Sequence, residues 1–169
     1  MLVKILGTGA LICAGLMIGR RQAEKIRKKA EFLQNFQEFI IHCKNEIRFF
    51  QTPILQLPGC YPSNGTFGTC VGKCSKLCKS GVAFNKSWKH SFEKILKEMD
   101  FNEKIINLFI KFGDELGAGD VDIQMVLCEF LIKKIEPEIN LLLNEYTLKI
   151  RLYTTLGSCA GAAAAIFLL

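Results

Sequence analysis

The stretch that decides the architecture is LYTTLGSCAGAAAAIFLL, residues 152–169, which contains no charged side chain. A near counterpart, residues 2–19, opens the chain and carries one charged side chain, Lys4. Because Lys4 can extend its ammonium group toward water, residues 5–19 are just long enough to cross a bilayer as a helix. The two ends therefore predict transmembrane helices at 2–19 and 152–169, with one domain at 20–151 between them.

A cleaved signal peptide is the alternative interpretation of residues 2–19. The sequence disfavours it, because the n-region holds a single lysine, Arg20 and Arg21 follow directly, and no small-residue cleavage site stands out. We therefore expect this segment to be retained as an anchor.

Basic residues lie beside both apolar ends. Arg20 and Arg21 follow the first, and Lys149 and Arg151 precede the second. Since Lys and Arg concentrate on the cytoplasmic side of membrane segments, both flanks predict a cytoplasmic central domain and external termini. A solvated helix face is the alternative explanation of the first basic run. The formal net charge of +6 thus fits a membrane protein, and no nucleic-acid-binding motif accompanies it.

The central domain shows helical periodicity throughout and no convincing period of two, which predicts an all-α helical bundle. Residues 20–51 lack Gly and Pro and carry one apolar stripe: Ile26, Leu33, Phe36, Ile40, Cys43, Ile47 and Phe50. Thr52-Pro53 has the pattern of a helix start, and residues 57–68 that of a loop.

Four further helices are expected, at 69–80, at 84–99, at 105–116 and from Asp120 onward. Asp100 with Glu103 fits a capping box before the third of these. The last carries Ile123, Leu127, Phe130 and Leu131, and Pro137 should kink it unless a new helix begins there.

The chain has eight cysteines, two of which lie in the apolar ends. Three others are spaced by four and share one helix face: Cys70, Cys74 and Cys78. The cluster could form a structural metal site, completed by Cys60 or by Cys43 beside His42. Because no second ligand pair is present, burial as reduced thiols in an apolar face is the favoured alternative. No cofactor is expected. Neither His42 nor His90 sits in a catalytic pattern, and no enzyme motif is found.

The turn from Leu116 to Gln124 is predicted to fix the angle between two core helices. Gly117 or Gly119 can adopt a positive φ, and Asp120 can cap the following helix. The alternative is that Asp120 and Gln124, one helical turn apart, form a spot that binds a partner.

Both apolar ends contain Gly-x-x-x-Gly, at Gly15–Gly19 and at Gly157–Gly161. Small residues four apart allow close approach of membrane helices, so these segments could pair with each other or with a partner, and a homo-oligomer is possible.

The layout resembles the stage III sporulation protein AB family of endospore-forming bacteria. The similarity is carried by IGRRQAEKIRKKAEFLQNF after the first anchor, by NEIRFFQTPI and by FGDELGAGDVDIQ, residues 112–124. The resemblance implies a non-enzymatic membrane platform, on the mother-cell side of the channel that links mother cell and forespore. It also implies similarity to the cytoplasmic domain of type II secretion platform proteins, and partners that include other channel components and a secretion-type ATPase.

Two other functions compete with this one. A metal- or redox-responsive membrane regulator would use Cys70, Cys74 and Cys78, and a membrane-bound enzyme would need a nucleophile or base that the sequence does not reveal.

Overall fold

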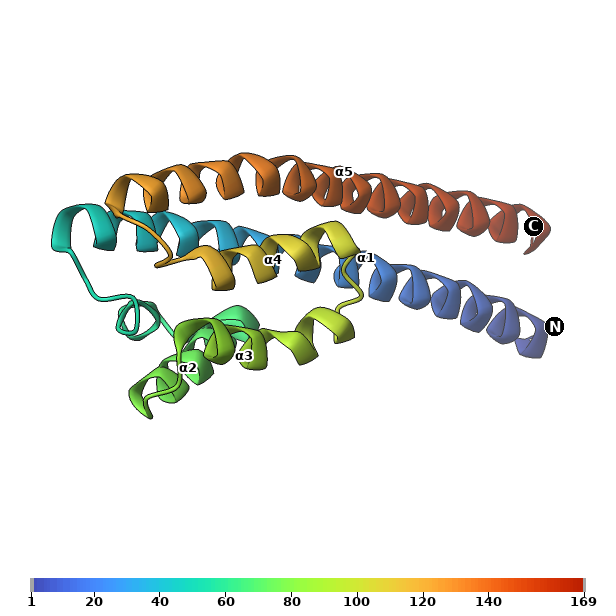
Figure 1. Cartoon of the computed structure of the whole chain (residues 1–169). Coiled ribbons are helices and arrows are strands. Elements are labelled where there is room, and N and C mark those ends of the chain that lie inside the picture. Colours follow the sequence, from blue (N-terminus) through green and yellow to red (C-terminus); the bar gives the residue numbers. More distant parts are fainter. Residues whose placement is uncertain (1, 169) are drawn as a thin grey trace. The chain divides into compact units, whose positions relative to one another are not determined.

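The computed structural model describes the backbone of residues 2–168 and the side chains of residues 20–157 and of Cys159. Every regular element in that part of the chain is helical, which confirms the predicted all-α fold (Figure 1). The elements are α1 (Leu2–Asn45), the π-helical turn η1 (Glu46–Phe50), the 3₁₀ turn η2 (Leu57–Gly59), α2 (Gly65–Lys79), α3 (Phe84–Glu98), α4 (Glu103–Glu115) and α5 (Val121–Leu168).

The chain divides into two compact units, residues 1–30 with 140–169 and residues 31–139. The first unit consists of the beginning of α1 and the end of α5. Within the described part of the chain, no helix has an apolar stretch long enough to cross a membrane. The structure does not describe the side chains of residues 2–19 and 160–169. The predicted anchors and most of both Gly-x-x-x-Gly pairs depend on these residues, so they lie outside the described part of the chain.

The second unit is built around aromatic side chains of α1. Phe32, Phe36 and Phe39 lie one turn apart and are essentially inaccessible to solvent. They contact aromatic rings of three other helices: Phe67 of α2, Trp88 and Phe92 of α3, and Phe109 and Phe112 of α4. Each such pair adds about 0.5–1.5 kcal/mol beyond the burial of its surface. Four residues of the hydrophobic stripe predicted from the sequence are buried in this core: Leu33, Phe36, Ile40 and Cys43.

The end of that stripe differs from the prediction. Ile47 is buried, but Phe50 is 72% exposed and its neighbour Phe49 is 68% exposed. The chain is π-helical from Glu46 to Phe50, and the wider turn changes the angle between successive side chains. Phe50 therefore no longer lies beneath Ile47 as it would in an α-helix.

The connection after α1 also differs from the prediction. No helix begins at Pro53; instead, Thr52 donates a hydrogen bond from its hydroxyl to the Glu46 carboxylate at 2.6 Å. The predicted loop 57–68 contains η2, and α2 begins at Gly65, within it. Gly68 permits this early start, because a Cβ there would lie 2.7 Å from the carbonyl oxygen of Pro62.

The capping box predicted at Asp100 is wrong, and of the two alternatives left open at Pro137 a new helix is excluded. Asp100 does not cap α4; it adopts φ +53° after α3, and the Asn102 side chain accepts the hydrogen bond from the Ile105 N–H at 2.9 Å. Further on, α5 continues through Pro137, so no new helix begins there. Buried Ile135 and Ile139 on either side hold the helix to the core despite the hydrogen bond that Pro cannot donate.

The buried face of α5 is also not the one expected. Leu127 and Leu131 are buried as predicted, but Ile123 is 60% and Phe130 is 40% exposed. The sequence is apolar on two adjacent faces here, and the unit buries the one that carries Gln124, Cys128 and Ile135. The other face remains on the surface.

Candidate functional site

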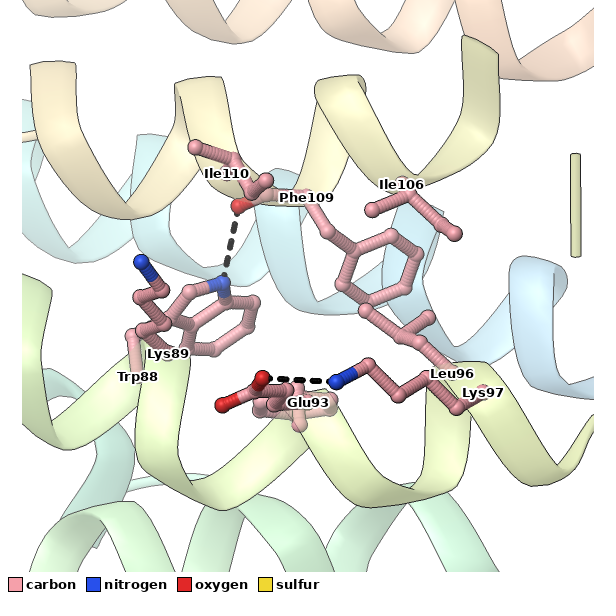
Figure 2. Close-up of a pocket in the computed structure, with 9 residues that line it drawn as sticks. Trp88, Lys89, Glu93, Leu96, Lys97, Ile106, Phe109 and Ile110 are labelled. Carbon is pink, nitrogen blue, oxygen red and sulfur yellow. Dashed lines mark hydrogen bonds and ion pairs between the residues drawn. The ribbon is translucent and has the colours of Figure 1, made fainter. Parts of the chain in front are cut away.

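An apolar pocket of about 200 Å³ lies between α3 and α4. It is lined by Trp88, Lys89, Phe92, Glu93, Leu96 and Lys97 of α3 and by Ile106, Phe109 and Ile110 of α4. Figure 2 shows the α3 residues facing Ile106, Phe109 and Ile110 across the space between the two helices. We refer to it as the α3–α4 pocket.

Trp88 forms the fixed wall of this pocket. Its indole N–H donates a hydrogen bond to the carbonyl oxygen of Phe109 at 2.9 Å, and the side chain is 2% exposed (Figure 2). The ring lies directly against the backbone of α4 at Gly113, where a Cβ would be 2.5 Å from the indole Cδ1 atom. Gly113 therefore allows the close approach of α3 and α4 that places the indole.

The rim of the pocket is charged. Glu93 accepts a hydrogen bond from Lys97, one turn further along α3, at 2.9 Å (Figure 2). This lysine, together with Lys89 and His90, lowers the pKa of the Glu93 carboxyl. Since Glu93 is paired with Lys97, Lys89 gives the rim a positive excess.

The lining of the α3–α4 pocket suits binding better than chemistry. None of the nine described residues around it is a histidine, a cysteine or a hydroxyl residue. Its volume lies near the roughly 150 Å³ of a cavity that accepts benzene, and below the roughly 300–1,000 Å³ typical of small-molecule sites. The pocket can therefore accommodate one aromatic or branched aliphatic side chain.

A second, more open hollow of about 540 Å³ lies between α2 and α3. Lys73, Lys76 and Lys94 line it together with Cys70 and the hydroxyl residues Ser63, Thr69 and Ser91. The hydroxyls of Thr69 and Ser91 are already donated to the backbone of their own helices, at 2.8 and 2.7 Å. The lysines give this hollow its positive character.

The structure separates the three cysteines of α2. Cys70 is partly exposed, whereas Cys74 and Cys78 are buried. Burial raises the pKa of the Cys74 thiol, and the adjacent Cys78 raises it further. Burial also raises the pKa of Cys70, which nearby Lys73 partly offsets. Among the described residues, no three of His, Cys, Asp and Glu lie close enough together to hold a metal ion.

The other candidate ligands are placed as follows. Cys43 is fully buried, Cys60 is exposed and His90 is exposed. His42 packs near the Tyr61 ring, and its buried Nε2 atom has no hydrogen-bond partner.

The turn between α4 and α5 has the geometry of a helix boundary. Leu116 is buried, and Gly117 has φ +92° and packs against Ile54. Asp120 accepts a hydrogen bond from the Ile123 N–H at 2.9 Å. The Gln124 side chain is buried and donates to the Gly119 carbonyl at 3.0 Å, so it shares no exposed surface with Asp120.

The predicted membrane-flanking residues belong to the first unit. Arg20, Arg21 and Arg151 are exposed, and Lys149 pairs with Glu145 at 2.9 Å. Arg20 also borders a hollow formed with Ile150 and Tyr153 of α5.

Sequence reasoning missed the α3–α4 pocket. The sequence predicts the helix at 84–99, and on it Trp88, Phe92 and Leu96 recur every four residues, a spacing that an ordinary core face shows equally well. A tryptophan flanked by Lys89 and Lys97 can lie in the core or form the wall of a pocket. Only the packing of α4 against it distinguishes these two possibilities.

The fold and the pocket define an all-α protein with an aromatic core and a surface that can receive an apolar side chain. The chain belongs to the stage III sporulation protein AB family, whose sequence pattern matches residues 4–169. This confirms the resemblance drawn from the sequence and implies a role in stage III of sporulation. Comparison with curated proteins and with solved structures found no match.

Proposed function

We propose that this protein is a non-enzymatic membrane platform of the sporulation channel, a secretion-like machine between mother cell and forespore. The observation that carries the proposal is membership of the stage III sporulation protein AB family over residues 4–169. Residues 2–19 and 152–169 anchor it, and residues 20–151 form the domain exposed to the mother-cell cytoplasm.

The charge pattern supports this topology. Arg20 and Arg21 follow the first uncharged segment, and Lys149 and Arg151 precede the second, as expected for segments whose inner ends face the cytoplasm. A reporter enzyme active only outside the cytoplasm should be active when fused to the C-terminus and inactive when inserted in the α2–α3 connection. A C-terminal fusion active only in the cytoplasm would contradict the proposed topology.

The surface supports a platform that binds other proteins. The α3–α4 pocket offers an apolar recess and a basic rim, and none of the residues that line it is a histidine, a cysteine or a hydroxyl residue. Its partners would be other channel components, including the secretion-type ATPase. The test is affinity capture of the tagged full-length chain from sporulating cells after mild cross-linking. Recovery of membrane proteins of the channel and the ATPase is expected, and their absence from a preparation that restores sporulation would contradict the proposal.

The alternative function, a metal- or redox-responsive regulator, depends on Cys70, Cys74 and Cys78. The structure gives it little support, because Cys74 and Cys78 are buried and only Cys70 is partly accessible. Burial also raises the pKa of the Cys74 thiol, which disfavours the reactive thiolate.

A further inference from the structure

The first two turns of α5 carry apolar side chains that the unit leaves uncovered. Val121 is 44%, Ile123 is 60% and Val126 is 67% exposed. We refer to these three residues as the α5 edge. Ile123 and Val126 are three residues apart and so share one face of the helix, adjacent to the face that buries Leu127 and Cys128. Exposed apolar groups that lie together mark surfaces that associate.

The next apolar residue along this face is treated differently. Phe130 is covered by the ammonium groups of Lys111 and Lys134, which lie 4.5 and 5.7 Å from its ring centre. No described contact of this kind covers Ile123 or Val126, so within residues 31–139 the bare part of this face lies at the start of α5.

The α5 edge lies in an acidic segment. Residues 112–123 contain Asp114, Glu115, Asp120 and Asp122 and no lysine or arginine, a net charge of −4. All four acidic residues are exposed. Asp122 is adjacent to Ile123 in the first turn of α5 and so accompanies the edge into any contact.

The α3–α4 pocket has the complementary charge. Residues 65–98, which form the α2–α3 hairpin, contain seven lysines and two glutamates, a net charge of +5. Two of these lysines, Lys89 and Lys97, line the pocket together with Trp88, Phe92 and Phe109. An acidic segment that presents a branched aliphatic side chain therefore matches this pocket in charge, polarity and volume.

We propose that the α5 edge of one copy docks into the α3–α4 pocket of a second copy, with Ile123 in the pocket and Asp122 beside Lys89. The second copy is the occupant because one chain carries both surfaces with opposite charge, which favours encounter and fixes orientation. Buried Leu116, Gln124 and Leu127 hold the edge to its own unit, so it cannot turn into the pocket of its own chain.

Such a contact is heterologous, because each copy contributes a different surface to it. Repetition of the contact produces either a ring or an open filament, depending on the rotation between copies. The association stands independently of the platform role, since it follows from the two surfaces alone.

The test follows the mass of the full-length chain in detergent solution by light scattering as its concentration is raised. Wild-type mass should grow with concentration. The edge variant Ile123→Asp and the pocket variant Lys89→Glu should each weaken the association by about tenfold or more. Ile41→Asp on α1, where Ile41 is 42% exposed, and Lys79→Glu, outside the pocket, are the matched controls and should behave nearly as wild type.

Mixing the two variants is the decisive experiment. The Ile123→Asp variant retains an intact pocket and the Lys89→Glu variant an intact edge, so the mixture should form a pair that neither variant forms alone. The double variant Asp122→Lys/Lys89→Glu should recover association through the exchanged charges. Association through the apolar ends, by contrast, would be the same in every variant.

Trp88, the single tryptophan of the chain, reports on the pocket directly. Its emission should shift with protein concentration in wild type and remain constant in Ile123→Asp, whose own pocket is unaltered. The inference is overturned if wild-type mass is independent of concentration, if the two variants fail to pair, or if both variants associate as wild type does. A pocket filled by a different protein would give the first of these results.

Discussion

Gly113→Ala tests how closely α3 and α4 are packed. The new Cβ would lie 2.5 Å from Cδ1 and 3.1 Å from Cγ of Trp88, so either the indole or α4 must shift. Overpacking a core costs about 1–3 kcal/mol. Displacing the indole would also weaken its hydrogen bond to Phe109, by about 1 kcal/mol. Alanine regains about 1 kcal/mol through its helix propensity, which leaves a net loss of about 1–3 kcal/mol.

The assay is thermal unfolding of the full-length chain, followed by circular dichroism and by Trp88 fluorescence. For a domain of about 100 residues, each kcal/mol lowers Tm by about 4–8 °C. Gly72→Ala on α2 is the matched control, because its Cβ would meet only the small Ser63 side chain, with Oγ at 3.1 Å and Cβ at 3.5 Å. A Gly113→Ala protein as stable as Gly72→Ala, with unchanged Trp88 emission, would refute the argument.

Three further predictions concern a cap and the buried thiols. Asp120→Asn should leave Tm and sporulation nearly unchanged, because Asn also caps helices. Asp120→Ala should lower the free energy of unfolding by about 0.5–2 kcal/mol, measured by thermal unfolding. A stable Asp120→Asn protein that fails in sporulation would show a binding role instead. Burial raises the pKa of the Cys128 thiol from 9.0 to about 11. Between these pH values the unfolded chain loses the thiol proton and the folded chain keeps it. The contribution of this group to the free energy of unfolding, at most about 3 kcal/mol, is therefore fully present below pH 9 and is lost as pH rises to 11. Denaturant unfolding should show a shallower loss over pH 9–11 in Cys128→Ala than in wild type, and equal slopes would count against it. Replacing Cys70, Cys74 and Cys78 by Ala should lower the stability through lost packing, without changing the zinc content or the metal dependence of sporulation. Elemental analysis that finds stoichiometric zinc in the wild type and none in the triple variant would reverse that conclusion.

The periodicity of the sequence predicted the helices well where one apolar face is unambiguous. The stripe from Ile26 to Ile47 is buried throughout, because its spacing leaves one choice of face. The same logic failed on α5, where Ile123 and Phe130 belong to an apolar face adjacent to the buried one. Which face is buried depends on contacts with α1 and α4, which the local sequence does not encode.

Helix ends were harder to predict because several residue types compete for the same role. Asp100 and Asn102 are both good caps, and the left-handed conformation of Asp100 leaves the role to Asn102. The π-helical turn at Glu46–Phe50 has no clear signature in the sequence. It arises where Thr52 binds Glu46, a contact between residues on either side of the turn.

The α3–α4 pocket could be predicted only in its parts. Trp88 and Phe92 fall within the helix predicted at 84–99, but a pocket requires two helices to approach at one point and diverge at another. Gly113 sets the point of approach through its missing Cβ, and that role depends on which side chain faces it.

The aromatic core has a consequence for the order in which the protein can fold. Phe36 and Phe39 leave the ribosome early, yet the Phe109 and Phe112 rings that pack on them, with centroids as close as 3.8 Å, are more than 70 residues further along the chain. By contrast, α2 and α3 contact each other across a connection of only four residues, so their hairpin can form as soon as it is synthesised. Until α4 is complete, the nascent chain can therefore cover Phe36 and Phe39 only in part, through Phe67 and Trp88 of the hairpin. A pause in translation before that point would leave the rest of their surface open to aggregation or to chaperones.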